Sequence, residues 1–110
     1  MLLQGKKAII TGGTRGIGFS VAEVFLKNGA SVALFGSRQE TVDKALAQLK
    51  SENPAWEVIG MAPDLTDYAA LDAAFSEVEN RFGRIDILVN NAGISAREPL
   101  YEYTCLLYTS

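Results

Sequence analysis

The sequence predicts an α/β fold in which one parallel β-sheet carries helices on both faces. Four short apolar runs alternate with three amphipathic segments of helical period along the 110 residues. Glycine or proline follows most of these segments and marks where each one ends. Strands that alternate with helices require right-handed crossovers, and such crossovers build parallel sheets. We expect the strands, numbered along the chain, to lie in the order 3-2-1-4.

The first strand and the first helix are expected near the N-terminus. Residues 7–11 form an apolar, β-branched run that ends at Gly12-Gly13, which is typical of a strand buried on both faces. A helix then starts at Gly16 and stops at Asn28-Gly29. Its apolar positions recur at helical spacing and are Ile17, Val21, Val24 and Phe25.

The second strand and helix are indicated by a continuous apolar run and a capping pattern. Residues 31–36 are apolar and too short for a helix bounded by glycines, so they are expected to form a strand. Ser37, followed three residues later by Glu40, fits a capping box, and Pro54 ends the helix. The inner stripe of this helix is expected to comprise Val42, Ala45, Leu46 and Leu49.

The third helix is expected between two further strands. Residues 56–61 and 85–90 are the apolar runs that predict these strands. Thr66 or Asp67 can cap the helix, and Gly83 closes it. Its inner face is expected to carry Leu71, Phe75, Val78 and Phe82.

Composition and charge exclude several classes of protein. With 48% apolar and 21% charged residues, the chain has the make-up of one soluble globular domain. A net charge of −3 gives no basic field for nucleic acid, and the apolar stretches break within about ten residues, short of a membrane span. The first seven residues lack a secretory signal pattern, so we expect a cytoplasmic protein. The absence of His excludes a Ser-His-Asp triad or a His-based metal site within these residues.

A glycine-rich segment, TGGTRGIG at residues 11–18, lies where the first strand turns into the first helix. Gly12 permits a tight turn, Gly16 leaves room for a pyrophosphate to approach the backbone, and Gly18 lets the helix pack closely on the strand. The helix N-terminus then favours an anion through its N–H groups and its dipole. The spacing Gly-x-x-x-Gly-x-Gly differs from the commonest dinucleotide fingerprint, so the alternative is an ordinary glycine-rich turn.

A second motif, NNAG at residues 90–93, stands at the carboxyl end of the fourth strand. This strand is expected beside the first one, so its end opens into the crevice where a parallel sheet reverses direction and ligands usually bind. Two amides there can bridge strand ends or contact a ribose. The alternative is a polar turn between a strand and a loop.

Together with Asp64-Leu65, these two motifs resemble the signatures of the short-chain dehydrogenase/reductase family. The resemblance covers residues 3–103 and implies a partial Rossmann fold. Within the family, the chain is most similar to 3-oxoacyl-[acyl-carrier-protein] reductases of fatty acid biosynthesis, although carbonyl, sugar and steroid reductases share the same motifs. The resemblance implies that the chain binds a nicotinamide dinucleotide. It also implies that the whole enzyme reduces a carbonyl substrate and forms a homo-oligomer.

The resemblance assigns roles to individual residues. The glycine motif would hold the pyrophosphate, Asp64 would lie against the adenine ring with Leu65 beside it, and residues 91–93 would line the nucleotide ribose. Asp64 has the alternative role of a loop residue that helps to start the next helix. The expected cofactor-binding residues are Gly12, Thr14, Arg15, Gly16, Ile17, Gly18, Ser37, Arg38, Asp64, Leu65, Asn91, Ala92 and Gly93.

The end of the second strand indicates NADP rather than NAD. NAD-specific Rossmann enzymes usually place an acid there to bind the ribose 2′-hydroxyl, whereas a nearby arginine accommodates a 2′-phosphate. Here the strand is followed by Ser37 and Arg38, with no acid until Glu40. Arg38 can pair with the phosphate, and Arg15 can approach the same group. The alternative for Arg38 is a solvated arginine in the first turn of a helix.

The last six residues, 105–110, differ in kind from those before them. They read CLLYTS, which the string TGT CTC TTA TAC ACA TCT encodes, and this string resembles a transposase-end adapter of sequencing libraries. We therefore expect residues 1–104 to be the native part and 105–110 a non-native tail, the alternative being a real apolar helix or strand. Cys105 is accordingly not expected to act as a nucleophile.

No catalytic residue is expected in this chain. In the family that it resembles, a later Ser and a Tyr-x-x-x-Lys motif perform the chemistry, helped by an Asn. Tyr101 and Tyr103 have no Lys four residues on, so neither fits that motif. We expect a truncated N-terminal part without reductase turnover. The alternatives are a non-catalytic dinucleotide-binding or redox-sensing module, and a truncation product with no function of its own.

Overall fold

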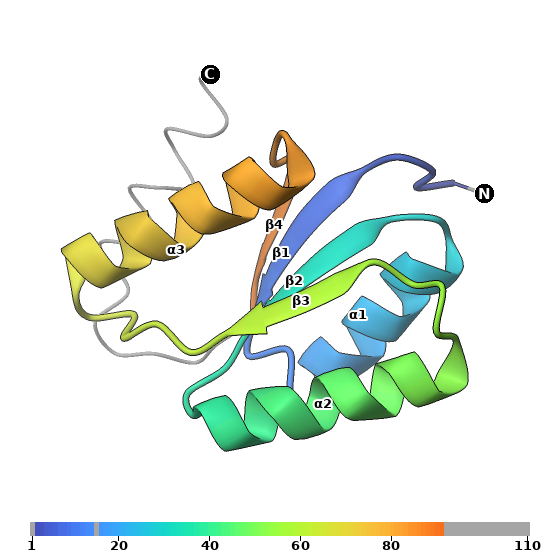
Figure 1. The fold of residues 1–110 in the computed structure, drawn as a ribbon, viewed down its shortest axis with the longest axis horizontal. Helices are drawn as coiled ribbons and strands as arrows, with labels where there is room; N and C mark the ends of the chain where they lie inside the picture. Colours follow the sequence, from blue (N-terminus) through green and yellow to red (C-terminus); the bar gives the residue numbers. More distant parts are fainter. Residues whose placement is uncertain (1, 15, 92–110) are drawn as a thin grey trace.

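The computed structural model describes residues 2–14 and 16–91, which form four strands and three helices (Figure 1). Strands and helices alternate along the chain, as the sequence predicted. No helix in the described ranges is both long and apolar enough to cross a membrane. In chain order the elements are β1 (Lys7–Thr11), α1 (Gly16–Lys27), β2 (Ser31–Phe35), α2 (Gln39–Glu52), β3 (Val58–Met61), α3 (Tyr68–Phe82) and β4 (Ile87–Asn90).

The four strands form one parallel sheet in the order β3-β2-β1-β4. Helices α1 and α2 cover one face and α3 covers the other (Figure 1). The predicted α/β class and the predicted strand order 3-2-1-4 are both confirmed. The architecture follows from the crossovers, because each helix returns the chain to the edge from which the next parallel strand can start.

The strand register aligns the carboxyl ends of all four strands in one row. Thr11 pairs with Phe35 on one side and with Asn90 on the other, and Phe35 pairs with Met61. These four residues are also the last residues of their strands. The loops that follow them therefore start side by side along one edge of the sheet.

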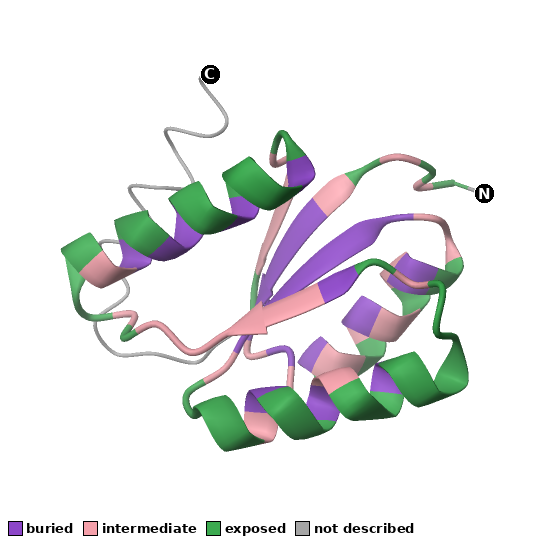
Figure 2. Ribbon diagram, in the orientation of Figure 1, coloured by how far each residue is buried: buried purple, intermediate pink, exposed green. Residues whose placement is uncertain are grey.

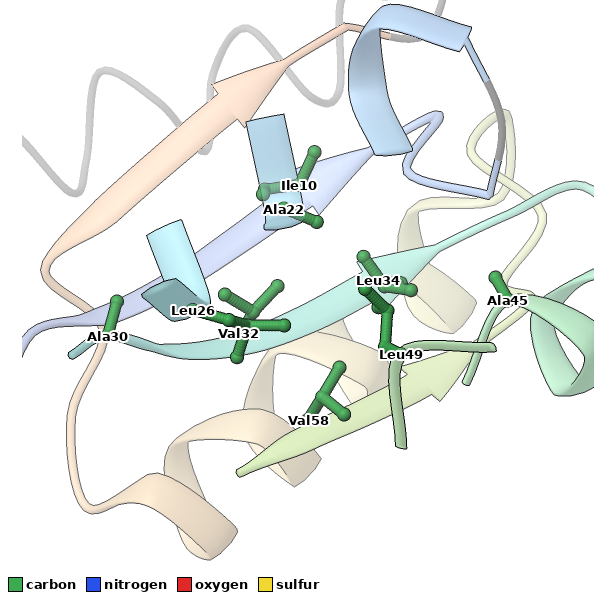
Figure 3. Close-up of a cluster of buried hydrophobic side chains, with 9 residues drawn as sticks. All are labelled: Ile10, Ala22, Leu26, Ala30, Val32, Leu34, Ala45, Leu49 and Val58. Carbon is green, nitrogen blue, oxygen red and sulfur yellow. The ribbon is translucent and has the colours of Figure 1, made fainter. Parts of the chain in front are cut away.

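The sheet buries a separate apolar cluster on each face, since successive side chains of a strand point to opposite faces. Along β1, Ile9 belongs to the cluster under α3, and Ile10 belongs to the cluster under α1 and α2. Figure 3 shows the second cluster between the sheet and the two helices. In β2 all five residues are buried, as expected for a central parallel strand (Figure 2). The cluster under α3 comprises Ile9, Ala33, Phe35, Leu71, Ala74, Phe75, Val78 and Phe82.

The inward face of α1 is not made of all the apolar positions that recur at helical spacing. The residues of α1 that are buried are Gly18, Ala22 and Leu26. Of the apolar positions that recur at helical spacing, Ile17 and Val24 are 75% and 54% exposed. At Gly18 no side chain fits, because the start of α1 packs against the glycine loop. Leu26 is buried further along the helix, and Phe19, Val21 and Phe25 pack partly buried against the cluster under α1 and α2.

The start of α2 also differs from the prediction. Arg38 is the N-cap residue, with an extended backbone, and its side chain makes no capping hydrogen bond. Ser37 lies one residue too early to cap the helix, so the predicted capping box with Glu40 was wrong. The hydroxyl of Thr41 instead donates to the Arg38 carbonyl oxygen at 2.9 Å.

Both ends of α3 follow the prediction. The carboxylate of Asp67 accepts hydrogen bonds from the backbone N–H groups of Ala69 at 3.0 Å and Ala70 at 3.2 Å. Gly83 ends the helix with a φ of 87°, a left-handed conformation that glycine adopts at low cost. Of the two cap candidates, Asp67 is therefore the one that caps α3.

Three strands are shorter than predicted, each at one end. β2 stops at Phe35, β3 starts at Val58 rather than at 56, and β4 starts at Ile87 rather than at 85. The Trp56 N–H donates to Asn53 within a turn at 3.2 Å, so this residue is not yet in the ladder. These differences leave the sheet order and the row of strand ends unchanged.

The cap of α3 gives a direct test of the fold. We expect Asp67→Ala to lower the free energy of unfolding by about 1 kcal/mol, because two N–H groups of the first turn lose their acceptor. Ser37→Ala is the matched control and should change this free energy by less than about 0.5 kcal/mol, since Ser37 caps nothing. Urea denaturation followed by circular dichroism measures both. Equal losses would contradict the assignment of the caps.

Candidate dinucleotide-binding site

The loops after β1, β2 and β4 bring most of the predicted site residues to one edge of the sheet. The strands end at Thr11, Phe35 and Asn90, which lie in register. The glycine loop, residues 12–16, follows the first of these strands, and the Ser37-Arg38 pair follows the second. In a parallel sheet this edge, next to the strand where the order reverses, is where ligands usually bind. The described residues of these three loops therefore start from a common edge.

The glycine loop is anchored to the end of β2. The N–H groups of Gly12 and Gly13 both donate to the Phe35 carbonyl oxygen, at 2.8 Å and 3.4 Å. Gly12 and Gly16 have φ values of 66° and 62°, a region that residues with a side chain rarely adopt. The sequence assigned glycine at these two positions to tight turning and close approach. The structure shows the backbone conformation that requires it.

Gly18 is required by the distance between α1 and the glycine loop. A Cβ atom at this position would lie 2.0 Å from the Gly12 carbonyl oxygen and 2.8 Å from the amide nitrogen of Asn91. Neither distance is possible for non-bonded atoms, so only glycine fits. This confirms the prediction that Gly18 lets the helix pack closely, and it adds Asn91 as a neighbour of the contact.

The start of α1 has features that favour an anion. The first N–H groups of a helix have no partner within it, and the helix dipole makes this end positive. No acidic residue occupies the first turn of α1. A Cβ at Gly16 would meet no other atom within 4 Å, so the space above this glycine is open. These features fit a diphosphate, the group that the motif was predicted to hold.

A buried hydroxyl connects the ends of β1 and β4. The Thr11 side chain is fully buried, and its Oγ1 lies 3.3 Å from the Val89 carbonyl oxygen and 3.2 Å from Asn90 Oδ1. The same oxygen accepts a hydrogen bond from the backbone N–H of Asn91 at 2.9 Å. Asn91 Nδ2 lies 3.5 Å from the Gly12 carbonyl oxygen and donates to it. Two predicted motifs, far apart in sequence, are thus joined through Thr11.

The role of Thr11 was not predicted from the sequence. The residue was treated as the end of a strand, although a hydroxyl at the buried end of an apolar run needs a hydrogen-bond partner. That requirement could have indicated that Thr11 bonds to another part of the chain. Its partners lie more than 75 residues away along the chain, at Val89, Asn90 and Asn91, so the local sequence did not name them.

Arg38 is exposed beside the end of β2. Its Nη1 lies 3.3 Å from Glu40 Oε1, and the two side chains are 68% and 72% exposed. An ion pair this exposed contributes little to stability, so Arg38 can exchange its partner for a phosphate at small cost. Ser37 is exposed next to it. Both residues stand where the sequence placed them, and their contact with a 2′-phosphate stays a prediction.

Asp64 and Leu65 already have structural partners. One carboxylate oxygen of Asp64 accepts hydrogen bonds from the Thr66 N–H at 2.9 Å and the Thr66 hydroxyl at 2.7 Å. These bonds hold the pKa of Asp64 below its ordinary value. Leu65 is half-buried against the cluster under α3. The alternative role of Asp64, in the turn that precedes a helix, is therefore present, and its adenine contact stays a prediction.

Three predicted site residues lie outside the described residues. They are Arg15, Ala92 and Gly93. The tail at 105–110 and the two tyrosines compared with the catalytic motif also fall outside. Within the described ranges, no group of three or more His, Cys, Asp or Glu residues could hold a metal ion.

A parallel sheet with the order 3-2-1-4 and a glycine loop between its first strand and first helix defines a Rossmann-like dinucleotide-binding domain. The model of the short chain dehydrogenase family matches residues 6–105. The chain therefore belongs to the short chain dehydrogenase family, whose members are oxidoreductases that bind nicotinamide dinucleotides.

Individual relatives differ in their names and cofactors. The chain is 54% identical to a 3alpha-hydroxysteroid dehydrogenase of Mediterraneibacter gnavus over 103 residues, which are 94% of this chain and 41% of that protein. The NADP-bound C-domain of a bacterial malonyl-CoA reductase is 34% identical, with a TM-score of 0.79 over 86% of this chain and 16% of that one. An NAD+-bound xylitol dehydrogenase is 30% identical, with a TM-score of 0.79 over 86% and 35%. The chain thus spans well under half the length of these proteins.

The buried hydroxyl gives a testable prediction. Thr11→Val keeps the shape of the side chain but leaves the Asn91 N–H without its acceptor, so we expect the free energy of unfolding to fall by about 1–3 kcal/mol. Thr11→Ser keeps the hydroxyl and should lose clearly less. Urea denaturation of the two variants beside the unaltered chain measures the difference. A valine variant as stable as the serine variant would rule out the connection.

Proposed function

We propose that this chain is the NADP(H)-binding N-terminal part of a short chain dehydrogenase that reduces a carbonyl group to an alcohol. The main support is the row of strand ends, which brings the glycine loop, Arg38 and Asn91 to one edge. When bound, the cofactor supplies the hydride. The residues of this chain bind the cofactor and orient it. In this proposal, the groups that protonate the substrate oxygen are not among these 110 residues.

NADP is proposed over NAD on the character of the residues after β2. Gly36 directly follows β2 and carries no acid that could bind a free 2′-hydroxyl. Arg38 is exposed two residues later, in a position to pair with a phosphate. Family members of similar structure are known with NADP and with NAD+, so the family alone does not choose.

For the substrate, two candidates are supported by different observations. The motifs resemble those of 3-oxoacyl-[acyl-carrier-protein] reductases, which favours a 3-oxoacyl thioester. The 54% identity to a 3alpha-hydroxysteroid dehydrogenase favours a steroid ketone or secondary alcohol. Both reactions interconvert a ketone and a secondary alcohol, so the same cofactor chemistry serves either one. We further propose a cytoplasmic homo-oligomer for the whole enzyme.

Cofactor preference is tested at Arg38. We expect Arg38→Asp to weaken NADPH binding relative to NADH by roughly tenfold or more, because an acid repels the 2′-phosphate and can accept a bond from a free hydroxyl. Titration of residues 1–110 with each cofactor, followed by cofactor fluorescence, measures the ratio. Arg81→Asp is the matched control, since Arg81 is a similarly exposed, ion-paired arginine at the far end of α3. An unaltered chain that prefers NADH would contradict the proposal.

The missing chemistry is tested by turnover. We expect residues 1–110 to oxidise no NADPH in the presence of an acetoacetyl thioester or a 3-oxosteroid, because a reductase without its proton donor loses orders of magnitude in rate. The Mediterraneibacter gnavus relative serves as the positive control for the steroid. Turnover by the 110-residue chain at a rate comparable to this control would overturn the proposed division of roles.

A further inference from the structure

The glycine loop is hydrogen-bonded to the end of β2. The Phe35 carbonyl oxygen accepts the N–H groups of Gly12 and Gly13. The next residue, Gly36, donates its N–H to the Met61 carbonyl oxygen at 3.0 Å. The backbone at positions 35 and 36 is therefore fixed from both neighbouring strands. It cannot move away from the loop without breaking these bonds.

Gly36 has no room for a side chain. A Cβ atom there would lie 2.6 Å from Thr14 Cγ2 and 2.7 Å from Val42 Cγ2, both shorter than real carbon contacts. The two methyl groups belong to β-branched side chains, whose χ1 rotation is restricted. Val42 is fully buried in the core and cannot yield. Gly36 does not have a positive φ, so its backbone conformation would accept a side chain. The obstruction at this position is therefore steric.

We propose that Thr14 and Gly36 form a steric pair that bars an acidic side chain from the end of β2 and so keeps the site open to a 2′-phosphate. This inference rests on the proposed NADP function and extends it to the packing of Thr14 against Gly36. Position 36 directly follows β2, where an acid would read the 2′-hydroxyl of NAD. The methyl group of Thr14 leaves no room for an acidic side chain at position 36.

The pair predicts how substitutions combine. With Thr14 present, a side chain at position 36 must displace the glycine loop from the end of β2, because Val42 blocks the other direction. The displaced loop is the one that binds the diphosphate, which both cofactors share. Gly36→Asp alone should therefore weaken NADPH and NADH together. Serine at position 14 lacks the methyl group that lies 2.6 Å away, so the aspartate Cβ can shift toward position 14 and away from Val42.

The experiment is a double-mutant cycle in residues 1–110, with NADPH and NADH as probes. We expect Gly36→Asp to weaken both cofactors by about tenfold or more. Adding Thr14→Ser should recover NADH binding by about tenfold and leave NADPH weak, so that the preference inverts. Thr14→Ser alone supplies the fourth corner of the cycle. An inversion by Gly36→Asp alone with no loss of NADH affinity, or purely additive effects, would overturn the steric pair.

Gly60 provides the matched control. A Cβ at Gly60 would lie 2.4 Å from Val42 Cγ1, but Thr14 is not among its nearest neighbours. Thr14→Ser should therefore raise the urea midpoint of Gly36→Ala and leave that of Gly60→Ala unchanged. If the unaltered chain bound neither cofactor, the proposed function and the specificity role would both be lost. The urea midpoints would still show whether Thr14 and Gly36 obstruct each other.

Discussion

The common register of the four parallel strands is the constraint on which the site depends. It places Thr11, Phe35, Met61 and Asn90 in one row, so that every loop at this edge starts beside the next one. A shift of one residue in a strand would turn its buried side chains to the opposite face. The two apolar clusters on the sheet faces therefore fix the register, and the register in turn fixes where a cofactor can lie.

Polar groups at the strand ends of this row form hydrogen bonds that hold the neighbouring segments together. The Phe35 carbonyl oxygen holds the glycine loop, and the Thr11 hydroxyl joins β1 to β4. Buried polar atoms are costly without partners, so these bonds also specify how the edges fit together. The close approach at Gly18 completes the arrangement by bringing α1 against the same loop. Positioning and stability thus depend on the same contacts.

The sequence predicted the order of elements and the strand order because both follow from the spacing of apolar runs. The apolar periodicity located α1 but not its inward side, because two of the residues that face inward, Gly18 and Ala22, are small. The cap of α2 was wrong by one residue, because the exact exit from β2 depends on its neighbours. The Thr11 connection and the closed position at Gly36 arise from segments distant in the chain, where no local pattern exists.

The small buried residues at the start of α1 have a consequence for the dynamics of the domain. Gly18 and Ala22 are the buried residues in the first half of the helix, and they remove little apolar area from water, so this end gains less from packing than a turn with large buried side chains would. Segments with weak packing open locally at lower free energy and exchange their amide hydrogens sooner. A ligand held at the N-terminus of this helix would bind only when the helix is folded and packed on the sheet. Ligand occupancy and protection of the α1 amides are therefore linked, and saturation slows hydrogen exchange most in this helix.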